Sequence, residues 1–230
     1  MLDFSKFRVL SFDCYGTLVA WEDGIFSALR PILAAHGKRA PDAAILELYG
    51  ELEAAAERPP FRRYRDVLAS VVHGFGERFG FTPSEAEVRS LPDSLKNWLP
   101  FPDTIEALRQ LKTRYQLAII SNVDDDLFAA TQSRLGVTFD QVITAQQAGC
   151  YKPGKKIFEL AEARIAVRRE QWLHVGQSVY HDVVPAQSLG IATVWVNRAS
   201  PRRGIGAVVA AQGEPDLEVP DLRGLAKAAA

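Results

Sequence analysis

The sequence predicts an α/β protein with a doubly wound parallel sheet and an inserted helical domain. A short apolar run over residues 9–12 ends in Asp13 and a glycine soon follows, which is typical of a buried strand and its turn. Residues 20–95 show apolar positions at helix spacing only. In the rest of the chain, strand patterns alternate with helix patterns, which indicates βαβ units and a parallel sheet. We therefore expect a core domain of residues 1–19 and 96–230 and a helical cap of residues 20–95.

The elements follow from apolar spacing and from the residues that interrupt it. In the insert, apolar positions recur at helix spacing in residues 25–33, 45–52, 64–75 and from residue 84 onward. In the core we expect strands at residues 117–120, 141–144, 172–175 and 192–196, and helices at residues 104–115, 127–135, 155–165 and 183–189. The tail from residue 213 contains two prolines and is expected to form a short helix.

Composition narrows the classes of function. The 230 residues carry 27 basic and 28 acidic side chains, so the chain lacks the basic excess of proteins that bind nucleic acid. No apolar run reaches the length of a membrane span, and the N-terminus lacks the pattern of a signal peptide. The two cysteines, Cys14 and Cys150, are too few for a disulfide scaffold. We therefore expect a cytoplasmic protein that binds neither membranes nor nucleic acid.

Polar side chains gather at the ends of the expected strands. Because parallel strands bring their carboxyl ends to one edge of a sheet, these side chains are expected to converge there. Taken singly, each motif is more typical of a turn or a helix cap than of a functional site. The residues concerned are Asp13 with Thr17, Ser121 with Asn122, Lys152, and Ser178 with Asp182.

Together these motifs resemble the haloacid dehalogenase superfamily of hydrolases, in order and in spacing. The likeness covers the sheet domain, about two-thirds of the chain, and implies a Rossmann-like core with a cap. It implies that Asp13 is the nucleophile and forms a covalent ester. The motifs are Asp13-Cys-Tyr-Gly-Thr-Leu, Ser121-Asn122, Lys152-Pro153 and Gly176-Gln-Ser-Val-Tyr-His-Asp182.

Two positions favour one branch of that superfamily. The phosphatases of the superfamily have an acidic residue at the position of Tyr15 in this chain. At the position of Gln177 they have a second acidic residue, which binds Mg²⁺. Neither a tyrosine nor an amide replaces a carboxylate near neutral pH. The sequence instead resembles the 2-haloacid dehalogenase branch, which works without metal or other cofactor. The resemblance implies hydrolytic dehalogenation of small 2-haloalkanoic acids.

The resemblance also implies roles for individual residues. Asp13 attacks C2 of the substrate, Thr17 orients Asp13, Lys152 holds it ionised, and Asp182 activates or positions the hydrolytic water. Ser121 and Asn122 bind the substrate carboxylate. The remaining substrate-binding candidates are Ser178, the wall residues Tyr15 and Tyr180, and Arg65 of the insert.

Three features depart from that branch. Near Gly50, where the branch has a halide-binding arginine, this chain has none, and the nearest arginines include Arg65. Phe158 replaces a tyrosine, and the fourth motif has the length seen in phosphatases. Two alternatives therefore stand beside the dehalogenase: a phosphatase for a small phosphorylated metabolite, and a non-catalytic binding protein. The expected partner is a small acid, and the resemblance allows a homodimer.

Overall fold

The computed structural model describes residues 2–198 and 211–230. Six parallel strands form one sheet in the order β3-β2-β1-β4-β5-β6. This confirms the predicted doubly wound α/β class. The strands are β1 (Val9–Phe12), β2 (Gln116–Ser121), β3 (Gln141–Thr144), β4 (Trp172–Gly176), β5 (Ala192–Val196) and β6 (Leu217–Val219).

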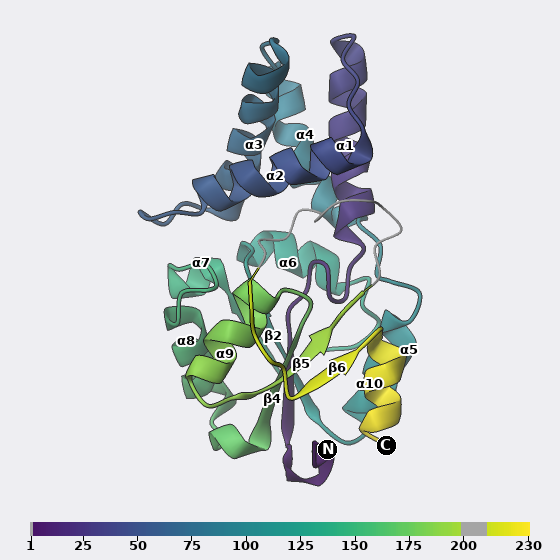
Figure 1. Cartoon of the computed structure of the whole chain (residues 1–230), viewed down its shortest axis with the longest axis vertical. Coiled ribbons are helices and arrows are strands. Elements are labelled where there is room, and N and C mark those ends of the chain that lie inside the picture. The colour runs from purple at the N-terminus through teal and green to yellow at the C-terminus, as the bar shows by residue number, and fades with distance from the viewer. Residues whose placement is uncertain (1, 199–210) are drawn as a thin grey trace.

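Helices cover both faces of the sheet, with α8 and α9 on one side and α5 and α10 on the other (Figure 1). The short helix predicted for the tail is present as α10, whereas β6, which precedes it, was not predicted. The core helices are α5 (Thr104–Lys112), α6 (Asp125–Gln132), α7 (Ala145–Ala148), α8 (Lys156–Ile165), α9 (Val184–Ser188) and α10 (Leu222–Ala228). Short 3-10 or π turns lie at Phe4–Lys6, Leu95–Asn97, Arg169–Gln171 and Val179–Val183.

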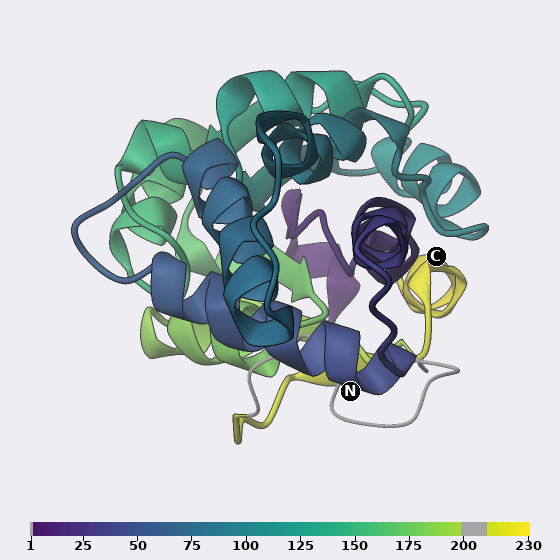
Figure 2. The same ribbon diagram turned by 90° about the horizontal axis from the view of Figure 1, so that it is seen from above.

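A cap of four helices stands over the carboxyl ends of the strands (Figures 1 and 2). The helices are α1 (Trp21–Ala35), α2 (Asp42–Ala56), α3 (Tyr64–Phe79) and α4 (Glu85–Ser94). The predicted capping box is present, since Ser84 and Glu87 exchange hydrogen bonds at the start of α4. The predicted domain boundaries, residues 20–95 for the cap, stay a proposal.

The register of the sheet decides which residues meet at its edge. Phe12 lies level with Ile119 of β2 and Val175 of β4. The residues that follow these three therefore come together beside β1. Strand order reverses at β1, and in open α/β sheets such a reversal is where ligands bind. No helix in the described part of the chain is long and apolar enough to cross a membrane.

Asp124 of the core fixes the start of cap helix α3. Its two carboxylate oxygens accept hydrogen bonds, each 3.0 Å long, from the backbone N–H groups of Tyr64 and Arg65. These N–H groups have no partner inside the helix, and the helix dipole also favours an anion there. Asp124 is fully buried, so its loss leaves these donors unsatisfied. The contact holds the cap against the core.

We expect Asp124→Ala to lower the free energy of unfolding by about 2 kcal/mol, because two buried N–H groups lose their acceptor. Urea unfolding followed by circular dichroism measures this change. Asp126→Ala is the matched control. Asp126 is exposed and pairs with the guanidinium groups of Arg63 and Arg65, so its loss should cost about 0.5 kcal/mol. Equal losses in the two variants would contradict this role for Asp124.

Candidate active site

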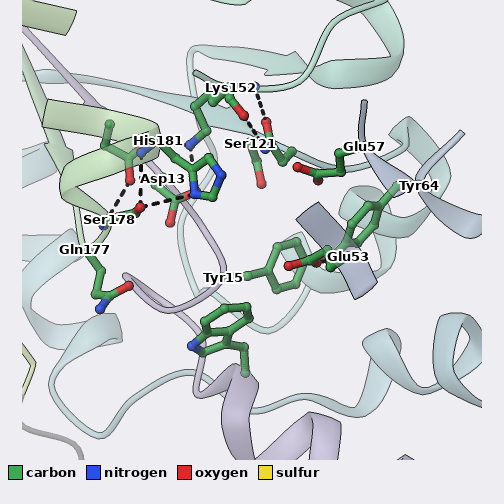
Figure 3. A pocket seen from close by; sticks show the side chains of 13 residues that line it. Asp13, Tyr15, Glu53, Glu57, Tyr64, Ser121, Lys152, Gln177, Ser178 and His181 are labelled. Carbon is green, nitrogen blue, oxygen red and sulfur yellow. Dashed lines mark hydrogen bonds and ion pairs between the residues drawn. The ribbon is translucent and has the colours of Figure 1, made fainter. Parts of the chain in front are cut away.

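Asp13 lies at the carboxyl end of β1, at the floor of a pocket between core and cap (Figure 3). Its backbone N–H donates to the carbonyl of Val175, which continues the sheet pairing by one residue. Gly16 then turns the chain with a φ of +93°, a conformation that side chains rarely adopt. This turn brings the Thr17 hydroxyl to 2.8 Å from Asp13 Oδ2, to which it donates. Thr17 therefore holds one carboxylate oxygen of Asp13 in place.

Lys152 joins Asp13 to Asp182. Its Nζ donates to Asp13 Oδ1 at 2.8 Å, to Asp182 Oδ1 at 2.6 Å and to the carbonyl of Ile120 at 2.9 Å. The ammonium therefore uses all three of its donors. Although burial lowers it, the pKa of Lys152 is raised well above its usual range by Asp13 and Asp182. One fixed positive charge thus lies between two carboxyl groups and offsets part of their charge.

Asp182 approaches the end of β4 closely. A Cβ placed on Gly176 would lie 2.4 Å from the Asp182 carboxyl group, so only glycine fits there. The backbone N–H of Ser178 donates to Asp182 Oδ2 at 3.2 Å. Burial opposes ionisation, but Lys152 and His174 more than offset it and hold the pKa of Asp182 well below its usual range. Asp182 is therefore a fixed anion and a weak base.

A buried chain of hydrogen bonds supports Asp182 from inside the sheet. Trp172 Nε1 donates to Ser11 Oγ at 2.7 Å, and Ser11 Oγ lies 2.8 Å from His174 Nδ1. His174 Nε2 lies 3.2 Å from Asp182 Oδ1. All contacts are satisfied when Ser11 donates to Nδ1 and Nε2 donates to Asp182. Asp182 is thus oriented by the core as well as by Lys152.

Asp13 differs from Asp182 in its electrostatics. Burial raises the pKa of Asp13, and the charge of Asp182 adds to this, while Lys152 and Thr17 lower it; the net shift is upward. Lys152 therefore favours the ionised form of Asp13, but burial is the larger effect. Both carboxylates line the pocket, and Asp13 is the more basic of the two.

Ser121 and Asn122 both line the pocket, but their side chains differ in whether their hydrogen-bonding groups are already engaged. The Asn122 side chain is engaged with the backbone of Lys152: its Oδ1 accepts from the N–H at 2.7 Å and its Nδ2 donates to the carbonyl at 3.1 Å. It therefore fixes the loop that carries Lys152. Ser121 Oγ is buried and has no hydrogen-bond partner among the described residues. A buried hydroxyl without a partner is costly, so Ser121 points to a ligand.

Tyr15, which was expected to form a wall, and Ser178, which was expected to bind substrate, both line the pocket. The ring of Tyr15 faces the pocket (Figure 3), and its hydroxyl lies 2.9 Å from Thr131 Oγ1 on α6. Burial raises the pKa of Tyr15 well above its usual range, so Tyr15 is a neutral wall. Ser178 lines the pocket, but its hydroxyl accepts from the backbone N–H of His181 at 3.1 Å and lies 3.1 Å from His181 Nδ1. Ser178 thus serves mainly as a helix cap.

Two expected substrate contacts are corrected by the structure. Arg65 does not reach the pocket, because its guanidinium pairs with Asp93 at 2.9 Å and Asp126 at 2.8 Å on the surface. The start of α3 is held by Asp124 in an orientation that turns this side chain outward. Tyr180 lines a neighbouring cavity and packs edge-on against His181, so it does not form a wall of the pocket of Asp13.

Several lining residues were not identified from the sequence. The cap contributes four of them and the fourth motif one: Trp21, Glu53, Glu57, Tyr64 and His181. The spacing of Tyr49, Glu53 and Glu57 is a signal that was available, because residues four apart share one helix face and Tyr49 is apolar enough to be buried. The pocket leaves a volume of about 60 Å³, which suits a ligand of few heavy atoms.

The donor set around Asp13 does not fit the Mg²⁺ site of the superfamily's phosphatases. The available oxygens of Asp13 and Asp182 face the ammonium of Lys152, and Tyr15 and Gln177 occupy the positions of two acidic residues. Mg²⁺ prefers carboxylates and phosphate oxygens in octahedral arrangement. Within residues 2–198 and 211–230, no group of three or more histidine, cysteine or acidic side chains is arranged to hold a metal ion.

His181 should make stability depend on pH. Burial lowers its pKa to about 4, against roughly 6.5 in an unfolded chain. Between these values the unfolded state binds a proton that the folded state does not, so stability should fall as the pH drops from 6.5 to 4. We expect His181→Gln to remove about 1–2 kcal/mol of the loss measured by urea unfolding between pH 7 and 4.5. The same loss in both proteins would contradict a buried, neutral His181.

Comparisons with known proteins agree on a family. The family model of haloacid dehalogenase-like hydrolases matches residues 7–190. The chain is 29% identical over 226 residues to an (S)-2-haloacid dehalogenase of Pseudomonas sp. (strain YL), covering 93% of this chain and 90% of that protein. It is 35% identical over 101 residues to a glyceraldehyde 3-phosphate phosphatase of Methanothermobacter thermautotrophicus, covering 43% of this chain and 45% of that protein.

A solved structure shows the same fold over nearly the whole length. The L-2-haloacid dehalogenase from Xanthobacter autotrophicus aligns with a TM-score of 0.78 and 20% sequence identity, covering 96% of this chain and 97% of that one. At this identity the likeness concerns the fold: the α/β core together with its helical cap.

Proposed function

The chain belongs to the family of haloacid dehalogenase-like hydrolases, and we propose that it hydrolyses the carbon–halide bond of small 2-haloalkanoic acids through an ester on Asp13, without a metal ion. The similarity to an (S)-2-haloacid dehalogenase over most of both chains supports the substrate class. The contact of one lysine ammonium with both Asp13 and Asp182 carries the proposal for the chemistry.

That contact suits halide displacement better than phosphoryl transfer. In phosphoryl transfer, charge builds up on phosphate oxygens, and a divalent cation offsets it. A halide departs as a stable anion, so its departure does not require a divalent cation. Lys152 supplies a single charge that keeps two buried carboxylates together without a metal. Tyr15, with a raised pKa, cannot protonate a leaving alcohol, whereas a halide needs no proton.

In the first step, an oxygen of Asp13 attacks C2 of the substrate. A C–O bond forms, the C–halogen bond breaks, and the halide leaves with the bonding electron pair. The carbon is inverted and an ester links it to Asp13. Thr17 and Lys152 orient the attacking carboxylate. Ser121, whose hydroxyl has no protein partner, donates to the substrate carboxylate.

In the second step, water attacks the carboxyl carbon of the Asp13 ester. The bond between that carbon and the ester oxygen breaks, the 2-hydroxy acid leaves, and one proton is released to solvent. Asp182 accepts a hydrogen bond from the attacking water and orients it. The low pKa of Asp182 favours this positioning role over that of a strong base. Asp13 leaves the step as a free carboxylate.

Metal independence separates the dehalogenase from the phosphatase alternative. We expect halide release from 2-chloropropanoate to be unchanged by EDTA and by added Mg²⁺, because Lys152 already supplies the cation of the site. Chloride release is measured with a halide-selective electrode, and phosphate release from a panel of sugar and triose phosphates serves as the comparison. Mg²⁺-dependent phosphate release without halide release would establish the phosphatase instead.

The second alternative, a non-catalytic binding protein, predicts a ligand bound without turnover by the intact chain. Halide release that exceeds the number of enzyme molecules excludes it. A homodimer and a cytoplasmic location stay predictions from the sequence. Sedimentation of the purified protein and fractionation of cells test them.

A further inference from the structure

The cap presents two carboxyl groups to the pocket of Asp13. Glu53 lies on α2 and Glu57 follows directly after the last residue of that helix, one turn further along. Figure 3 shows both on the opposite side of the pocket from Gln177 and Ser178. Glu53 is fixed by two hydroxyl groups: Tyr49 donates to its Oε1 at 2.8 Å and Tyr64 at 2.5 Å. These two hydrogen bonds fix the orientation of the Glu53 carboxyl group. The pair therefore forms a defined, acceptor-rich end of the pocket.

The carboxyl group of Glu57 has neither a hydrogen bond nor an ion pair with any described residue, and its backbone N–H donates to the carbonyl of Glu53. Burial and the neighbouring Glu53 raise its pKa well above the usual range, and Lys152 lowers it in part. Lys152 cannot also bind Glu57, because its three donors are used. Arg58 lines the cavity beside Glu57 but forms no ion pair with it. A half-buried carboxyl group without a partner is unfavourable until a ligand supplies one.

Among the described residues that line the pocket, carboxyl groups outnumber basic side chains. Four carboxyl groups, those of Asp13, Glu53, Glu57 and Asp182, face a single basic side chain, that of Lys152. No arginine lines the pocket within residues 2–198 and 211–230. A ligand with only a carboxylate would meet this excess unfavourably at the cap end. A ligand with a positive charge there would balance it.

A second, independent feature also points to a ligand. Ser121 is fully buried and lines the same pocket, and its Oγ has no acceptor in the part of the chain that the structure describes. Ser121 lies at the end of β2, in the core, whereas Glu53 and Glu57 belong to the cap. The pocket thus offers a free donor on the core side and free acceptors on the cap side. A dipolar molecule, with an anionic and a cationic end, satisfies both.

We propose that the substrate is a 2-haloacid that carries an ammonium group on its third carbon, with its carboxylate toward Ser121 and its ammonium toward Glu53 and Glu57. This inference rests on the proposed function, since it places C2 of the same substrate class at Asp13. Glu53 and Glu57 would select the substrate, and Asp13 would perform the chemistry. The small volume of the pocket favours a short substrate over a long-chain one.

The first experiment compares two chloroacids of nearly equal shape. 3-Amino-2-chloropropanoate and 2-chlorobutanoate differ by an ammonium in place of a methyl group. We expect kcat/KM for chloride release to be at least about ten-fold higher with the amino acid, the factor expected from one charge-assisted hydrogen bond. Glu57→Gln should remove that preference. Glu51→Gln, the same change on the exposed face of α2, should retain it.

The second experiment measures binding without reaction, so it does not depend on dehalogenation. 3-Aminopropanoate and butanoate lack a halogen and can be titrated into the intact protein by nuclear magnetic resonance. We expect 3-aminopropanoate to bind at least about ten-fold more tightly, and Glu57→Gln to abolish the difference. Equal or undetectable binding of the two acids would overturn the ammonium subsite.

The two experiments separate the two proposals. Chloride release from both chloroacids without a preference that depends on Glu57 would retain the dehalogenase and overturn the subsite. Selective binding of 3-aminopropanoate without chloride release from any 2-haloacid would retain the subsite and overturn the dehalogenase.

Discussion

Replacing Asp13 with asparagine should reduce halide release by roughly 10⁴-fold or more, because the amide is a far weaker nucleophile than the carboxylate and no other group takes its position. Asp13 is the one carboxylate of the core that faces the pocket from the end of β1, with Thr17 and Lys152 each holding one of its oxygens. Steady-state chloride release from 2-chloropropanoate measures the loss.

The variant should stay folded. Asparagine keeps the shape of Asp13 and can still accept from Thr17, while Lys152 retains Asp182 as its counter-ion. Its thermal midpoint should therefore lie within a few degrees of the wild-type value. Asp126→Asn, the same change at an exposed carboxylate, should leave turnover unaltered. Activity of Asp13→Asn within ten-fold of wild type would show that Asp13 is not the nucleophile.

Replacing Lys152 with methionine should lower turnover by roughly 10³-fold, because the attacking carboxylate loses both its counter-ion and its orientation. The variant should also lose stability. Asp13 and Asp182 would be left close together in the core without a cation, and breaking such a buried pair costs about 3–5 kcal/mol. Stability should recover in part at low pH, where the carboxyl groups become protonated.

Urea unfolding and chloride release, both measured on purified protein at pH 7, test the two effects of Lys152→Met. Lys155→Met is the matched control, since Lys155 is exposed a few residues along the same segment and should tolerate the change. Near-normal turnover in Lys152→Met would show that Lys152 has only a structural role in its loop. A stable but inactive variant would show that its charge is needed for the reaction alone.

Much of the core could be predicted because its constraints are local. The run before Asp13 is short and apolar, and parallel pairing brings the ends of β1, β2 and β4 to one edge whatever the details of packing. Asp13, Lys152 and Asp182 therefore meet as the sequence predicted. β6 was not predicted, because three residues between two prolines carry too little apolar pattern to reveal a strand.

The cap side of the pocket was harder to predict, because it depends on how helices dock. Arg65 is basic and close in sequence to the expected site, but Asp124 anchors α3 so that Arg65 turns to Asp93 and Asp126. Glu53 and Glu57 resemble solvated helix residues until α2 is placed over the sheet. Only the docked structure shows that they face Asp13.

A single turnover in ¹⁸O-labelled water tests the covalent ester on Asp13 most directly. With enzyme in excess over 2-chloropropanoate, water attacks the carboxyl carbon of Asp13, so the label should appear in Asp13 and the released 2-hydroxy acid should carry an unlabelled oxygen from the protein. Mass spectrometry of the peptide that contains Asp13 and of the product detects both. Label in the product and none in Asp13 would mean that water displaces the halide directly and would contradict the ester.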